Sequence, residues 1–394
     1  QLSSTHATPL ARAPRLTPPM WIDRREQLAA AVERWRAGAA PGGVALDTEF
    51  VFERTFRPRL GLIQIAAGGE IALVDTVRIA DLSPLAALLT APNVRKIVHS
   101  GSGDVPILRR ATGASPQPLF DTQIAAAFAG LGPSLSYAAL IRELFAVELP
   151  KHETRTDWLR RPLSTDQLRY AAEDVEQLEA AATELERRLR ELGRLEWALE
   201  DSAELSLLES DAADASVAWR RVKGLDRLPP HGRAVARALA AWREREADRL
   251  DLARSFLLRD ETLLALARRD GIAPQEIAKL PGYEARRHAQ HAARWVAALT
   301  EARAAVAADT APAEPARLAA EERERRGALE DAISALVGRR AGELGLSPEL
   351  LLSRRQRDRA LTAWRDSGGG SLAESVGGFR GRLLGAELDA LAGG

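Results

Sequence analysis

Two acidic residues end an apolar run in the first third of the chain. Asp47 and Glu49 lie in Val44–Phe50, a short apolar segment of the kind that forms a buried strand. Residues two apart on a strand point to the same face, with backbones about 7 Å apart. Two carboxylates on one face repel each other unless a cation or a proton neutralises them. Taken alone, the pair could also be ordinary charges where a strand emerges into solvent.

Two more acidic residues occur where a strand and a helix would place them near the first pair. Asp104 follows the apolar run Val94–His99 and a Gly-Ser-Gly turn, and alone it could be a helix N-cap. Asp174 lies four residues after Tyr170, so the two share one face of a predicted helix. Alone, they could be a core tyrosine and a solvated charge. The Gly-Ser-Gly turn lacks the spacing of a phosphate-binding loop.

Considered together, the four carboxylates favour a metal centre. They come from a strand, a helix start after another strand and a later helix, an arrangement that gathers acids over a sheet edge. The chain has no cysteine, and hard oxygen ligands suit Mg²⁺ or Mn²⁺. Two such ions, about 4 Å apart, stabilise the attacking and departing oxygens in phosphoryl transfer.

The elements that must position these residues follow from the hydrophobic pattern. We expect strands over Val44–Phe50, Leu60–Ala67, Ile71–Asp75 and Val94–His99. We expect helices over Leu82–Leu89, Val105–Arg110, Thr122–Ala129, Tyr137–Val147, Asp166–Leu192 and Leu195–Glu209. The first three strands would form a β-meander, after which strand and helix alternate. The pattern predicts an α/β fold with a mixed sheet covered by helices.

Several segments, in order, resemble the motifs of the DEDD 3′→5′ exonucleases. Val44–Phe50 with Leu60–Ile65 resembles the first motif, and Lys96–His99 with Gly103–Val105 resembles the second. Leu119–Gln123 resembles the segment after it. Asp157-Trp158, Arg161–Leu163 and Tyr170–Val175 resemble the third motif in its tyrosine form. The spacing is most similar to the bacterial ribonuclease D family, and the resemblance covers residues 21–208.

The resemblance implies a ribonuclease H-like exonuclease domain and a set of residue roles. The ligands of two divalent metal ions, Mg²⁺ or Mn²⁺, would be Asp47, Glu49, Asp104 and Asp174. Tyr170 would orient the attacking water, since a free tyrosine, with a pKa of about 10, is a poor base at neutral pH. Phe50 and Gln64 would line the substrate cleft. His99 and Asp121 are candidates for supporting or structural roles.

The chain is predicted to contain further helical domains. Residues 217–300 are helical in pattern, and Trp219–Gly224, Ala241–Arg245, Leu263–Ala267 and Ile277–Pro281 resemble the HRDC domain. We therefore expect a disordered leader over 1–19, an exonuclease domain over 20–211, an all-α HRDC domain over 216–300 and a second, degenerate HRDC-like domain over 318–394. Trp219, Trp242 and Trp295 occur at core-like positions, where packing is favoured over stacking on bases.

Charge is distributed unevenly along a chain whose total is neutral. There are 55 Lys+Arg and 55 Asp+Glu, so composition alone indicates no nucleic-acid partner. Residues 171–215 nevertheless hold 14 acids and 4 bases, whereas 216–300 hold 17 bases and 10 acids. Basic side chains on a helical domain suit sequence-tolerant contacts with phosphates. The neutral total therefore results from an acidic segment and a basic segment whose charges cancel.

These observations predict an exoribonuclease that trims 3′ ends of structured RNA, such as tRNA precursors with 3′ extensions, releasing nucleoside 5′-monophosphates. One alternative is a 3′→5′ exonuclease on single-stranded DNA or RNA fragments. Another is a non-catalytic nucleic-acid-binding protein on a nuclease fold. No run approaches the roughly 18 apolar residues of a membrane helix, so we expect no membrane partner. A cytoplasmic monomer is the expected state.

Overall fold

The computed structural model describes residues 18–38, 42–150, 156–207, 214–311 and 320–393. Nearly all of the leader expected over 1–19 lies outside the described residues. The chain divides into two compact units. The first comprises Gln1–Glu49, Leu60–Ser210 and Leu318–Gly394, and the second comprises Phe50–Arg59 and Asp211–Arg317.

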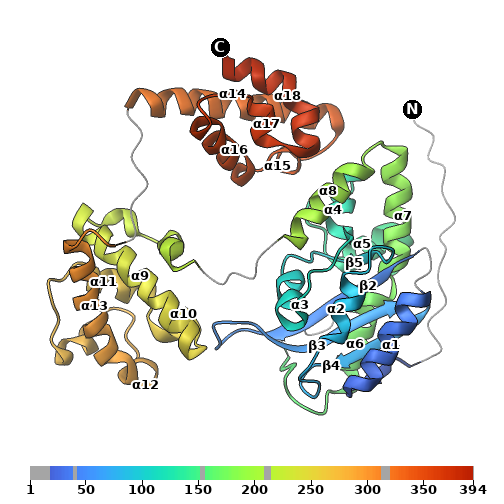
Figure 1. Cartoon of the computed structure of the whole chain (residues 1–394), viewed down its shortest axis with the longest axis horizontal. Helices are drawn as coiled ribbons and strands as arrows, with labels where there is room; N and C mark the ends of the chain where they lie inside the picture. Colours follow the sequence, from blue (N-terminus) through green and yellow to red (C-terminus); the bar gives the residue numbers. More distant parts are fainter. Residues whose placement is uncertain (1–17, 39–41, 151–155, 208–213, 312–319, 394) are drawn as a thin grey trace. The chain divides into compact units, whose positions relative to one another are not determined.

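A mixed sheet forms the centre of the first unit (Figure 1). Its strands are β1 (Met20–Ile22), β2 (Val44–Val51), β3 (Arg59–Ala67), β4 (Glu70–Asp75), β5 (Lys96–Val98) and β6 (Leu119–Asp121). They lie in the order β1-β4-β3-β2-β5-β6. β3 is antiparallel to β4, whereas β1 pairs in parallel with β4, and β5 pairs in parallel with both β2 and β6. The predicted mixed sheet is confirmed. β1 and β6, which were not predicted, have only three residues each.

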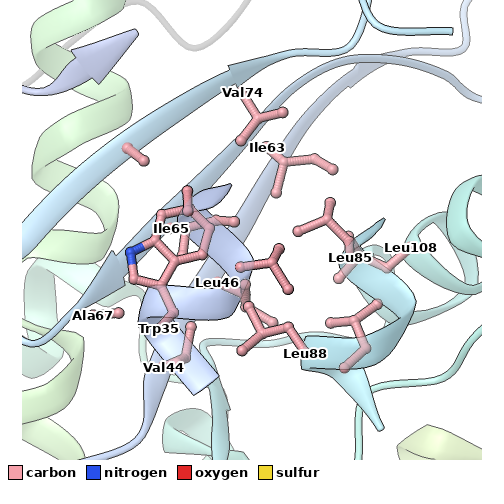
Figure 2. Close-up of a cluster of buried hydrophobic side chains, with 14 of the residues drawn as sticks. Trp35, Val44, Leu46, Ile63, Ile65, Ala67, Val74, Leu85, Leu88 and Leu108 are labelled. Atoms are coloured by element: carbon pink, nitrogen blue, oxygen red, sulfur yellow. The ribbon is translucent and has the colours of Figure 1, made fainter. Parts of the chain in front are cut away.

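Helices enclose this sheet. They are α1 (Arg25–Gly38), α2 (Pro84–Leu89), α3 (Asp104–Thr112), α4 (Thr122–Phe128), α5 (Tyr137–Phe145), α6 (Thr165–Glu176), α7 (Leu178–Glu191) and α8 (Leu195–Ser206). One face of the sheet packs against α1, α2 and α3. Figure 2 shows Leu46 of β2 and Ile63 and Ile65 of β3 in this core with Trp35 of α1 and Leu85 of α2. Because side chains alternate along a strand, the neighbouring positions of β2 and β3 face the other side of the sheet.

The helix predicted over Asp166–Leu192 is wrong in one respect: the structure divides it into α6 and α7. The hydroxyl of Tyr137, on α5, donates a hydrogen bond to the carbonyl of Glu173 (3.2 Å) and accepts one from the amide of Gln177 (3.2 Å). In a continuous helix that amide would bond to that carbonyl directly. The Tyr137 hydroxyl is therefore inserted between a carbonyl and an amide that would otherwise bond to each other. The hydrophobic pattern of residues 166–192 does not predict this interruption.

A buried ion pair fixes the segment that leads into α6. The guanidinium of Arg161 donates to both carboxylate oxygens of Asp75 (2.9 and 2.7 Å), which is fully buried. It also donates to the carbonyls of Gly61 (2.7 Å) and Trp158 (2.8 Å). At Gly61 a β-carbon would lie 2.5 Å from the carbonyl oxygen of Trp158, so this position requires glycine. The segment before α6 is thereby held against β3 and β4.

The C-terminal helices of the first unit have their own apolar core. They are α14 (Ala320–Leu344), α15 (Pro348–Leu351), α16 (Arg354–Asp366), α17 (Leu372–Val376) and α18 (Gly378–Gly393). α18 contacts α8, where the ring of Phe379 stacks on that of Trp197 with centroids 5.1 Å apart. Arg380 donates to Asp201 (2.7 Å). The helices of residues 320–393 thus pack against the helices at the end of the exonuclease region.

Where the structure describes the second unit, its regular elements outside residues 50–59 are all helices. It contains the short helices η1 (Ala215–Arg221), η2 (Leu225–Arg227), α10 (Arg254–Leu257), η3 (Pro274–Lys279), α12 (Ala285–His288) and η4 (Ala289–His291), and the longer α9 (Pro230–Leu250), α11 (Asp260–Ala267) and α13 (Ala292–Ala307). Trp295 is fully buried and donates to the carbonyl of Leu257 (3.1 Å). Segment 50–59 joins this unit through Arg57, which binds Asp248 through two hydrogen bonds (2.8 and 2.9 Å). None of the described helices combines the length and apolar character needed to cross a bilayer.

Replacing Arg161 with Leu should destabilise the protein strongly. The substitution removes the only buried cation that binds the Asp75 carboxylate and leaves the exposed Arg78, 3.8 Å away, as its remaining cation among the described residues. Removing one partner of a buried ion pair costs about 3–5 kcal/mol. Chemical denaturation measures the loss. Arg25→Leu is the matched control, because Arg25 also binds an aspartate, Asp81, but both side chains are about half exposed (52% and 53%) and such pairs contribute little. Equal effects of the two substitutions would contradict the assigned role of the buried pair.

Candidate metal centre and active site

Three of the four predicted carboxylates meet at one edge of the sheet. Asp47 and Glu49 lie near the end of β2, and Asp174 lies on α6. One carboxylate oxygen from each lies within 4.8 Å of those from the other two, and all three residues are partly buried. The capping box at Ser164 and Gln167 begins α6, and Asp174 follows almost three turns later. A strand end and a helix therefore converge on one small volume.

The fourth carboxylate, Asp104, lies beside this cluster. It is the first residue of α3, and Gly103 is the N-cap, so the alternative interpretation of Asp104 as the N-cap is wrong by one position. The Asp104 carboxylate accepts a hydrogen bond from the hydroxyl of Thr48, which lies between Asp47 and Glu49 on β2. Asp104 is outside the 4.8 Å group, yet its charge raises the pKa of both Asp47 and Glu49. No pattern in the sequence distinguishes Thr48, which connects the two sets of acids.

The acids are under strong electrostatic strain as a group. Burial, followed by the charges of Asp104 and Asp174, raises the pKa of Asp47 well above its usual value. Burial and the same neighbours raise the pKa of Glu49 to about 8. Burial raises the pKa of Asp104 to about 6, against the opposing effect of the Thr48 hydrogen bond. No cationic side chain is among the causes of these pKa shifts. A group of converging carboxylates suits a hard divalent cation, which prefers oxygen ligands.

Tyr170 stands one helical turn before Asp174 on α6. Burial and the charges of Asp174 and Glu49 raise its pKa above the ordinary value, and its hydroxyl is hydrogen-bonded to Asp174. The ring of Trp158 lies 6.1 Å from its own, measured between centroids. A phenol with a raised pKa keeps its proton at neutral pH. The hydrogen bond to Asp174 places this hydroxyl beside the acids, and its role in orienting water stays a prediction.

Asp121 and His99 contact the backbone around the site. Asp121, which is buried, accepts hydrogen bonds from the amides of Ser100 (3.1 Å) and Gly101 (2.8 Å), at the start of the turn that leads to Asp104. His99 contacts the hydroxyl of Thr122 (2.9 Å) and the carbonyl of Leu135 (3.0 Å). Burial lowers the pKa of His99, which favours the neutral ring. These contacts support the structural interpretation of both residues.

The two residues expected to line the substrate cleft differ in their placement. Gln64 is fully buried on β3, and neither amide atom has a hydrogen-bond partner among the described residues. Its burial argues against direct contact with a substrate, and the role expected for it in the cleft stays a prediction. Phe50 is half-buried, and its ring lies 5.9 Å from that of Phe52, which is 61% exposed. Phe50 therefore stays a candidate.

Tyr137 is a residue of the site that the sequence did not reveal. It lies on α5, and the charges of Asp174 and Asp47 contribute to raising its pKa, after the larger effect of burial. Its hydroxyl bridges the junction of α6 and α7. The predicted helix over Tyr137–Val147 included it only as a first residue, and no local pattern distinguishes it from a core tyrosine.

Comparisons with known proteins agree with this geometry. A family model described as a 3′-5′ exonuclease matches residues 19–190, and an HRDC domain model matches 232–299. The chain is 36% identical over 368 residues to ribonuclease D of Pseudomonas paraeruginosa, covering 93% of this chain and 96% of the relative. It is 36% identical over 366 residues to ribonuclease D of Escherichia coli, covering 92% and 95%. The crystal structure of the Escherichia coli protein, described as an exoribonuclease involved in structured RNA processing, matches with a TM-score of 0.82 at 35% identity, covering 95% of this chain and 98% of that one.

With divalent metal removed by a chelator, Glu49→Gln should raise the thermal midpoint at pH 8 and change it little near pH 5. The pKa of Glu49 rises from 4.5 to about 8 on folding, so the folded state holds a proton that the unfolded state loses. Stability from this group is therefore full below pH 4.5 and is lost as the pH rises to about 8. Calorimetry across this range tests the prediction, with Glu143→Gln, an exposed position on α5, as the control. A midpoint difference that is independent of pH would refute it.

Proposed function

The chain belongs to the ribonuclease D family of 3′-5′ exoribonucleases, and we propose that its acidic cluster holds two divalent metal ions, Mg²⁺ or Mn²⁺, at which RNA is hydrolysed. The observation that carries the proposal is the convergence of Asp47, Glu49 and Asp174 within 4.8 Å. Asp104 is added because its charge acts on two of the three. Carboxylates crowded in this way favour a bound cation strongly.

Each residue of the cluster has a distinct part in this proposal. Bound divalent ions would neutralise the carboxylates and lower the pKa of the attacking water. Asp47, Glu49 and Asp174 would hold them from two sides, and Thr48 would fix the carboxylate of Asp104. Tyr170 keeps its proton and, being bonded to Asp174, would orient the water for in-line attack on the terminal phosphodiester. The products are a nucleoside 5′-monophosphate and an RNA one nucleotide shorter with a 3′-hydroxyl.

The proposed substrates are structured RNAs, of which tRNA precursors with 3′ extensions are one class. The Escherichia coli relative is described as acting in structured RNA processing, which supports the class but not the individual RNA. We also keep the proposed domains: exonuclease over 20–211, HRDC over 216–300 and a second HRDC-like domain over 318–394. The matches over 19–190 and 232–299 support the first two. A cytoplasmic monomer remains the proposed state.

Exposed basic residues of the second unit are the proposed phosphate contacts. Part of its basic surplus is used internally, because the following side chains contact carboxylates: Arg221, Arg243, Arg249, Arg254, Arg259, Arg269, Arg287 and Arg294. Arg220, Lys223 and Arg227 lie around η1 and η2, just before α9, with side chains that reach solvent. The first unit has a basic group of its own, Arg354, Arg355 and Arg359, on the exposed side of α16.

Asp104→Asn should abolish release of mononucleotides and leave the thermal midpoint unchanged or higher, since it removes one of the repelling charges. The assay uses a tRNA with a 3′ extension and a DNA of matched sequence, each with and without Mg²⁺ or Mn²⁺, and identifies the products. Asp166→Asn, an exposed position on the same helix as Asp174, is the control and should retain activity. Equal cleavage of DNA would favour the fragment exonuclease, and absence of metal-dependent cleavage would favour a non-catalytic binding protein.

Replacing Arg220, Lys223 and Arg227 together with Gln should weaken RNA binding and flatten its dependence on salt. For single-stranded RNA, every phosphate that the variant no longer neutralises should reduce the slope of log K against log salt by about 0.7. Filter binding in chelator, between low and moderate salt, measures the slope. The triple variant of Arg354, Arg355 and Arg359 is the comparison. An unchanged slope in the first variant would contradict the role of the second unit in holding RNA.

A further inference from the structure

The junction between α6 and α7 is built around one side chain from a third helix. Glu173 and Gln177 are four residues apart, the spacing of a helical hydrogen bond. Their carbonyl and amide instead each bond to the Tyr137 hydroxyl at 3.2 Å. Insertion of a side chain into the helical ladder is a recognised cause of a sharp kink. The hydroxyl is therefore a structural part of the junction.

This junction lies within one turn of both active-site residues of α6. Asp174 directly follows Glu173, and Tyr170 lies one turn earlier. The two helices are each fixed by their own buried residues, Ala171 and Val175 in α6 and Leu178 with Ala181 in α7. The break between the helices lies at Gln177, three residues after Asp174, whose carboxylate meets those of Asp47 and Glu49 from β2.

Tyr137 is itself anchored to the part of the fold that carries Asp104. The carbonyl of Leu135, two residues earlier, accepts hydrogen bonds from the side chains of Gln123 (2.9 Å) and His99 (3.0 Å). The rings of His99 and Tyr137 lie 5.7 Å apart. His99 follows β5, whose chain continues through the turn to Asp104. Tyr137 thus connects the helix of Asp174 with the strand before Asp104.

We propose that Tyr137 is a positioning residue of the metal centre, whose hydroxyl sets the angle at which α6 presents Asp174 to Asp47 and Glu49. The inference rests on the proposed function, because it assigns the break between α6 and α7 to the geometry of metal ligands. Tyr137 touches neither substrate nor metal in this role. It acts through the backbone of residues 173–177.

The test compares Tyr137→Phe with Tyr283→Phe, a tyrosine in the second unit whose ring packs against Trp295. The phenyl ring keeps the packing of Tyr137, and the carbonyl of Glu173 and amide of Gln177 can then bond to each other, so no buried polar group is left without a partner. Mn²⁺ binding is measured by calorimetry without RNA, and RNA cleavage is measured as a function of metal concentration. The thermal midpoint is recorded in chelator.

For Tyr137→Phe we expect Mn²⁺ affinity to fall about tenfold or more, as for other residues that orient metal ligands. The midpoint in chelator should stay at or above that of the wild type, and cleavage should recover towards the wild-type rate at high metal concentration. KM for RNA should be unchanged, and Tyr283→Phe should match the wild type throughout. These results separate positioning from simple stabilisation, which would lower the midpoint and leave metal affinity intact.

Wild-type Mn²⁺ affinity in Tyr137→Phe would overturn the inference, as would loss of its cooperative unfolding transition. A wild-type protein that binds Mn²⁺ but does not cleave RNA would overturn the proposed function alone, since the comparison of metal affinities would still decide the role of Tyr137. A wild-type protein that does not bind Mn²⁺ would overturn both.

Discussion

Repulsion between carboxylates held close together at a sheet edge is the constraint on which the first unit depends. Free carboxylates in water would move apart, but β2 holds Asp47 and Glu49 on one face of the sheet, and α6 brings Asp174 to them. Burial, and then the charges of Asp174 and Asp104, raises the pKa of Glu49 to about 8. The apolar core on the opposite face of β2 and β3 stabilises the strand that carries them (Figure 2). Local conflicts of this kind are expected at functional sites.

The supports of the site act mainly on the backbone. Asp121 holds the amides of Ser100 and Gly101 before Asp104, and Arg161 holds carbonyls of β3 and of the segment before α6. Thr48, by contrast, bonds directly to the carboxylate of Asp104 and so joins β2 to α3. These contacts orient the carboxylates by fixing the turns and helix ends that carry them.

The sequence predicted β2, β3 and β4 closely, because each is a buried apolar run bounded by glycine or charge. β1 and β6 are too short to show a period. α1 escaped prediction although Leu28, Ala31, Val32 and Trp35 follow helical spacing. The acids were found through motifs that keep residue types in order, whereas the full burial of Gln64 on β3 could not be read from alternation alone. The division at Gln177 depends on Tyr137, 40 residues earlier, and so lies beyond any local pattern.

Segment 50–59 belongs to the second unit, although it continues the strand that carries Asp47 and Glu49. Phe56 packs on the apolar core of that unit, and its ring lies 4.5 Å from the guanidinium of Arg254, while Arg57 binds Asp248. A nuclease shortened to end near residue 210 would expose Phe56 and leave Arg57 without its carboxylate. The second unit therefore cannot be replaced freely, because any gene fusion or graft that replaces it must also supply a surface that accepts residues 50–59.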